Sequence, residues 1–115
     1  MKQTVVFDFD GVIHSYTSGW KGADVIPDPP VPGIKEVIKE LRSMYYEVVV
    51  VSSRAATFEG VYAMEEYLKE NDIAVDYITD TKPPAIVYID DRAICFDGHP
   101  ETLVEKIVYF KPWNK

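Results

Sequence analysis

The chain has 115 residues, of which 47% are hydrophobic and 27% charged, and its formal net charge is −7 at pH 7. This length suits one domain, residues 1–115, and the composition excludes a disordered or fibrous chain. The acidic charge argues against non-specific nucleic-acid binding, which depends on clusters of lysine and arginine. No apolar run of about 18 residues and no signal-peptide pattern is present, so we expect a cytoplasmic protein with no membrane partner.

The first predicted element is a buried strand that starts at Thr4 and ends in two carboxylates. Its β-branched and aromatic residues do not alternate with polar ones, which is typical of a parallel strand covered on both faces. Asp8 and Asp10 follow, and Gly11 then allows the backbone to turn sharply. Two desolvated carboxylates this close repel each other unless they share a proton or a cation. We therefore expect a divalent metal here, in preference to an acidic turn that only caps the next element.

A long connection rich in Ser, Gly and Pro runs from residue 14 to residue 32. Loops of this length without secondary structure are usually lids or binding loops. Trp20 and Lys21 offer an aromatic face and a cation, so we take them as candidate substrate-binding residues. Trp20 could equally anchor the loop on the core, and the sequence leaves both interpretations open.

The middle of the chain predicts a helix, a buried strand and a second helix. The helix spans residues 34–44, with an apolar stripe of Ile34, Val37, Ile38 and Leu41. A Val-rich strand over residues 47–51 ends in polar residues, and a helix capped by Thr57 runs to about residue 71. The polar residues at the end of this strand are Ser52, Ser53 and Arg54.

The last third of the chain predicts two or three short strands and a final helix. Strands over residues 75–78 and 85–89 are expected, and the second of them ends in Asp90 and Asp91. A further strand is predicted over residues 94–96, with Cys95 as a small core residue, and a helix over residues 100–108. The tail from Phe110 to Trp113 could dock on the body or contact a partner, and both possibilities stay open.

Strands that alternate with helices predict an α/β fold, a single Rossmann-like domain in which a mostly parallel sheet has helices on both faces, giving a three-layer sandwich. In such sheets the ligand site lies beyond the carboxyl ends of the strands. Three separate segments end there in polar groups, so we expect them to form one site. Its acidic oxygens suit a hard cation such as Mg²⁺.

These motifs, in this order and at these strand ends, resemble the haloacid dehalogenase superfamily of phosphotransferases and phosphatases. The resemblance covers residues 4–92. Asp8-Phe9-Asp10-Gly11-Val12 is similar to the first family motif, Ser52 to the second, Lys82 to the third and Asp90-Asp91 to the fourth. Val12 stands where many members have threonine.

The resemblance implies a magnesium-dependent phosphatase that works through an aspartyl-phosphate intermediate. Asp8 would be the nucleophile, and Asp10 the general acid and then the base. Ser52 would hydrogen-bond a phosphoryl oxygen, and Lys82 would neutralise charge on it. The implied Mg²⁺ ligands are the Asp8 carboxylate, the Asp10 backbone carbonyl and the Asp90-Asp91 pair; which member of the pair binds directly stays open.

Ser53 and Arg54 follow the second motif, and both are candidate substrate-binding residues. Arg54 could clamp a substrate phosphate or carboxylate, or could be an ordinary surface arginine.

No separate cap domain fits in this chain, because residues 14–32 form only a loop. The resemblance therefore implies an open site for a phosphorylated small molecule or macromolecule end, or a lid supplied by a homo-oligomeric partner. A non-catalytic or regulatory phosphate-binding module of the same fold is the alternative function. A phosphoaccepting receiver domain is disfavoured, because its phosphorylated aspartate should follow a middle strand.

Overall fold

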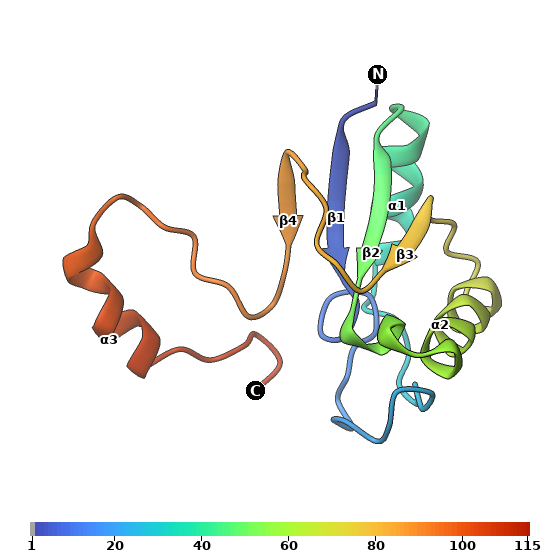
Figure 1. Cartoon of the computed structure of the whole chain (residues 1–115), viewed down its shortest axis with the longest axis horizontal. Coiled ribbons are helices and arrows are strands. Elements are labelled where there is room, and N and C mark those ends of the chain that lie inside the picture. Colours follow the sequence, from blue (N-terminus) through green and yellow to red (C-terminus); the bar gives the residue numbers. More distant parts are fainter. Residues whose placement is uncertain (1) are drawn as a thin grey trace.

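The computed structural model describes residues 2–115 and shows an α/β protein built on a four-stranded, fully parallel sheet (Figure 1). The strands lie in the order β3-β2-β1-β4. The strands are β1 (Thr4–Asp8), β2 (Glu47–Val51), β3 (Tyr77–Thr79) and β4 (Val87–Ile89). The helices are α1 (Ile34–Ser43), α2 (Phe58–Glu70) and α3 (Leu103–Val108), and two short 3₁₀ helices span Ser53–Ala56 and Pro100–Thr102.

The hydrophobic core lies on one face of the sheet. Val5 pairs with Val48 and Phe7 with Val50, and all four side chains belong to the same buried cluster. Ile38 of α1 and, on α2, Met64, Tyr67 and Leu68 belong to the same cluster, so both helices cover the same face. The prediction of α1 is confirmed, except that Val37 is 47% exposed and does not join the buried stripe.

Within residues 2–115, no helix covers the opposite face of the sheet. Val6 and Val49 alternate with the core residues and therefore point to this face, where both are buried. Because β3 and β4 lie at opposite edges, the linker between them, residues 80–86, must cross the sheet, and it passes on the side away from α1 (Figure 1). The prediction of helices on both faces is thus wrong for this chain: α3 packs against neither face.

The chain after β4 leaves the sheet (Figure 1). The strand predicted over residues 94–96 does not form, because this segment finds no neighbouring strand to pair with. Cys95 is exposed, which corrects its prediction as a core residue. Within residues 2–115, no helix is long and apolar enough to cross a membrane.

Candidate functional site

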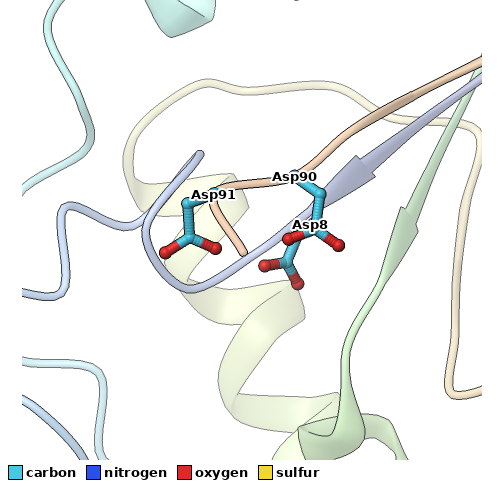
Figure 2. A group of neighbouring side chains, drawn as sticks. All are labelled: Asp8, Asp90 and Asp91. Atoms are coloured by element: carbon cyan, nitrogen blue, oxygen red, sulfur yellow. The ribbon is translucent and has the colours of Figure 1, made fainter. Parts of the chain in front are cut away.

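Three carboxylates meet at the carboxyl ends of the two adjacent strands β1 and β4. Asp8 is the last residue of β1, and Asp90 and Asp91 follow directly after β4. One carboxylate oxygen from each residue lies within 4.8 Å of the other two. Figure 2 shows the three side chains gathered where the two chain segments converge. The structure thus brings these three predicted residues together at the strand ends.

The electrostatics of this carboxylate cluster are unfavourable without a cation. Burial, a hydrogen bond with Asp91 and the charge of Asp90 raise the pKa of Asp8 to about 7. The Oδ1 atom of Asp91 is buried and has no hydrogen-bond partner within the described residues. A buried carboxylate oxygen without a partner is costly, and a hard divalent cation would satisfy it. The residues therefore fit Mg²⁺.

Gly11 allows the loop after β1 to approach the loop after β4. Its φ is +85°, and a Cβ placed there would lie 2.1 Å from Oδ2 of Asp91. A side chain at this position would force the Asp91 carboxylate to move. The absence of a Cβ at Gly11 thus sets how closely Asp91 can approach β1.

Asp10 belongs to a second group, separate from the three clustered carboxylates. Nε of Arg54 donates to both carboxylate oxygens of Asp10, at 2.9 and 3.1 Å, and Nδ1 of His14 lies 2.8 Å from Oδ1. Burial would raise the pKa of Asp10, but these hydrogen bonds and the charge of Arg54 outweigh it and hold the pKa below its usual value. Asp10 is therefore an oriented, ionised carboxylate.

Arg54 is fully buried and links Asp10 to the 14–32 loop. Its Nη1 donates to three backbone carbonyls of the loop, at 2.8 to 3.1 Å, and its guanidinium lies 4.7 Å from the ring centroid of Trp20. The carbonyls belong to Gly22, Ala23 and Val25. As placed here, Arg54 is not the surface arginine that the sequence left open. A substrate contact through its unpartnered Nη2 stays a prediction.

His14 is the member of this group that sequence reasoning missed. The residue is fully buried, and its Nε2 accepts a hydrogen bond from the backbone N–H of Asp28 at 3.1 Å. Because Nε2 accepts, Nδ1 carries the proton and donates to Asp10. The only signal in the sequence is a histidine four positions after Asp10, at the start of a loop whose composition predicted an exposed segment.

The remaining predicted site residues differ in how deeply they are buried. Ser52 is buried at the end of β2, and its Oγ accepts the N–H of Arg54 at 3.1 Å, which leaves its own proton free to donate. Ser53 and Lys21 are exposed, and Trp20 is 54% exposed. Trp20 thus anchors Arg54 with one part of its ring while another part still faces solvent.

Lys82 does not join the site in this structure. It lies on the 80–86 linker, with its Nζ 4.7 Å from the ring centroid of Tyr88. Within residues 2–115 it forms no ion pair with Asp8. The role that the resemblance implies for Lys82 stays a prediction.

No protein-family model and no curated protein sequence matches this chain significantly.

The C-terminal tail closes one side of the site. Nε1 of Trp113 donates to the backbone carbonyl of Gly11 at 2.6 Å, and Nδ2 of Asn114 donates to that of Ser15 at 3.1 Å. Trp113 lines a shallow cleft together with Asp90 and Asp91. Of the two possibilities left open for the tail, docking on the body is the one that the structure shows.

Proposed function

We propose that this protein is a phosphate-monoester hydrolase of the haloacid dehalogenase type, with a Rossmann-like core, that depends on Mg²⁺ and uses Asp8 as its nucleophile. The observation that carries this proposal is that two aspartates two residues apart have different surroundings. Asp8 lies in a carboxylate cluster suited to a cation, while Asp10 is ionised and held by Arg54 and His14. A nucleophile and a separate acid-base group are what a two-step phosphoryl transfer requires.

In the first step an Asp8 carboxylate oxygen attacks phosphorus, the phosphorus–oxygen bond to the leaving group breaks, and the leaving alkoxide takes a proton from Asp10. In the second step Asp10 removes a proton from water, which attacks phosphorus and releases inorganic phosphate and free Asp8. The low pKa of Asp10 suits the second step directly. The first step requires Asp10 to take up a proton as the substrate binds.

Mg²⁺, held by Asp8, Asp90 and Asp91, would supply positive charge that keeps Asp8 ionised and offsets charge on the phosphoryl oxygens. The hydroxyl of Ser52 is free to donate a hydrogen bond to one of those oxygens. Trp20 and Lys21 are exposed on the 14–32 loop, where they can contact the remainder of a phosphorylated substrate, whether a small molecule or a macromolecule end.

A phosphate-binding module without turnover is the second candidate, and the position of Lys82 favours it. The cation that the resemblance assigns to the phosphoryl group lies on Tyr88 instead. Such a module would bind Mg²⁺ and phosphate but would release no product.

The test is phosphate release from sugar phosphates, nucleotides, phosphopeptides and phosphorylated oligonucleotides, with and without Mg²⁺. We expect turnover that requires Mg²⁺ and disappears in Asp8→Asn. Asp24→Asn, at an exposed carboxyl on the 14–32 loop, is the matched control and should keep activity. Magnesium and phosphate binding without turnover on every substrate would favour the binding module.

A further inference from the structure

A segment of the chain that we call the C-terminal arm, residues 93–112, projects from the body with its apolar side chains uncovered (Figure 1). Val104, Ile107 and Val108 are 61 to 75% exposed. Their i, i+3, i+4 spacing places them on one stripe of α3, as in a helix that packs on a hydrophobic surface. The stripe has no such surface in this chain.

The arm is nevertheless not a loose tail. Its start follows β4, which is held by its pairing with β1, and its end is held by the hydrogen bond from Trp113 to Gly11. Both ends are thus attached to the same part of the body, while the apolar middle extends outward (Figure 1). A segment held in this way has a defined place from which to reach another molecule.

A second uncovered apolar surface lies at β4. This strand pairs with β1 alone, so its other edge is free, and Val87, Tyr88 and Ile89 are 38 to 43% exposed. Parallel sheets are ordinarily covered on both faces, and a free apolar edge is a template for pairing with another strand. The missing neighbours of β4 are therefore a strand on its edge and a helix over its face.

The arm carries both of these missing elements. Ala93-Ile94-Cys95-Phe96 is an apolar segment with strand-forming residues and no pairing partner, and the helix α3 with its apolar stripe follows it. The arm also has only three acidic residues against two basic ones, so little repulsion opposes its docking on an acidic body. One chain thus carries both halves of a complementary contact.

The arm cannot easily fill this place on its own sheet. A parallel neighbour in the same chain needs a crossover of about a dozen residues, whereas only residues 90–92 separate β4 from the start of the arm, and an antiparallel neighbour would need these three residues to form a hairpin turn. Two of those three residues belong to the carboxylate cluster. A second molecule has no such restriction.

We propose that the chain forms a symmetric dimer in which each C-terminal arm docks on β4 of the other chain. The contact is reciprocal, so it closes after two molecules and leaves no free apolar surface to propagate. Each chain places its segment 93–96 beside the free edge of the partner's β4 and its α3 over the adjoining face.

The first test is the mass in solution by light scattering coupled to gel filtration, under reducing conditions. We expect twice the 13.1 kDa of one chain for the wild type and for Cys95→Ser. Val104→Asp and Ile107→Asp, made separately, should each give the mass of one chain. Val37→Asp, at an exposed valine of α1, is the matched control and should remain dimeric. A monomeric wild type, or a dimer that survives both arm substitutions, would overturn the proposal.

The second test identifies which chain supplies the arm. Tagged chains whose only cysteine is Cys95 are mixed with untagged chains carrying Cys95→Ser and Val87→Cys, and a short bismaleimide cross-linker is added. We expect a covalent dimer of one tagged and one untagged chain, lost when Ile107→Asp is added to the tagged chain. Absence of this cross-linked dimer would contradict docking of the arm on the other chain. In a separate sample, a chain that carries Val87→Cys together with Cys95 is cross-linked alone, and a cross-link found only within single chains would show instead that the arm closes on its own sheet.

Discussion

At the residue scale, Asp8 and Asp10 lie two positions apart but have opposite surroundings. Asp8 faces two other carboxylates, and Asp10 faces a guanidinium and an imidazole N–H. The pKa of Asp8 is raised and that of Asp10 lowered accordingly. The protonation of the two aspartates therefore depends differently on pH, and each can be tested by a substitution of its own.

Without metal, Asp8→Asn should stabilise the fold at pH 8. The pKa of Asp8 is about 7 in the folded chain against its ordinary value of 3.8, so the stability that its protonated form gives is complete below pH 3.8 and is lost as the pH rises through about 7. Asparagine removes this loss. We expect the free energy of unfolding by urea to rise by about 2 kcal/mol at pH 8 in EDTA, and by less at pH 4.5.

The same measurement with excess Mg²⁺ should reverse the order, because the cation stabilises only the chain that retains Asp8. Asp24→Asn should change neither result. Equal stability of the wild type and Asp8→Asn at both pH values would show that Asp8 is not strained by its neighbours.

Removal of Arg54 should be far more costly than removal of an exposed arginine. Arg54→Ala leaves Asp10 with a single polar partner and also releases the carbonyls at residues 22–25, so we expect a loss of about 3 to 5 kcal/mol in urea unfolding. Arg42→Ala, which breaks a partly exposed pair with Asp76, is the control and should cost about 1 kcal/mol or less. Similar losses for both would mean that the buried network contributes little.

The sequence predicted the carboxylates at the strand ends because a parallel sheet brings those ends together. It could not predict that Asp10 is clamped by His14 and Arg54. That contact depends on how the 14–32 loop folds over the end of β2, and loop conformation has no periodic signal in the sequence. For Lys82 the sequence predicted a role at the site, but in the structure its ammonium group lies over the ring of Tyr88 instead.

At the element scale, the loop after β1 and the loop after β4 fit together at Gly11. A Cβ there would lie 2.1 Å from Asp91, in a backbone conformation that already favours glycine. The geometry of the carboxylate cluster therefore depends on the contact between these loops as well as on the strands that carry them.

Gly11→Ala should accordingly weaken Mg²⁺ binding as well as stability. Gly33→Ala is the matched control, because φ there is +89° and no atom lies within 4 Å of the added Cβ. We expect Gly33→Ala to cost about 1 kcal/mol from backbone strain alone and to leave Mg²⁺ affinity unchanged. Gly11→Ala should cost more and lower the affinity measured by calorimetry at least tenfold. Equal effects of the two substitutions would mean that backbone strain alone explains the loss and that the contact with Asp91 contributes nothing.

The helices and strands were not all predicted equally well. The bounds of α1, β2 and α2 are close to those expected, because each has a clear apolar period or a cap, such as the hydrogen bond from the Gly60 N–H to the Thr57 side chain. The segment 94–96 has strand-forming residues but no strand, because a strand needs a neighbour and this chain does not place one beside it. The local sequence indicates the propensity of a segment to form a strand, whereas pairing depends on which strands the fold places beside that segment.

At the scale of the whole molecule, the shape agrees with an incomplete sheet. The radius of gyration is 14.9 Å, whereas a compact chain of this length is expected to have about 13 Å. The projecting arm accounts for the difference (Figure 1).

If the arm is exchanged between two chains, stability must depend on protein concentration. We expect the apparent free energy of unfolding of the wild type to rise by about 1.4 kcal/mol per mole of dimer for each tenfold increase in chain concentration. Val104→Asp should unfold at the same urea concentration throughout, since a monomer has no such dependence. A wild-type midpoint that does not move over a hundredfold range would contradict exchange.

The hydrogen bond between Trp113 and Gly11 also makes the chain its own optical probe. The chain has two tryptophans, and their indoles occupy distinct environments: Trp113 bonds to the turn beside the carboxylates, and Trp20 stacks under Arg54. In a Trp20→Phe chain, emission would come from Trp113 alone. Occupation of the site and displacement of the tail could then be followed by intrinsic fluorescence in real time, with no attached dye.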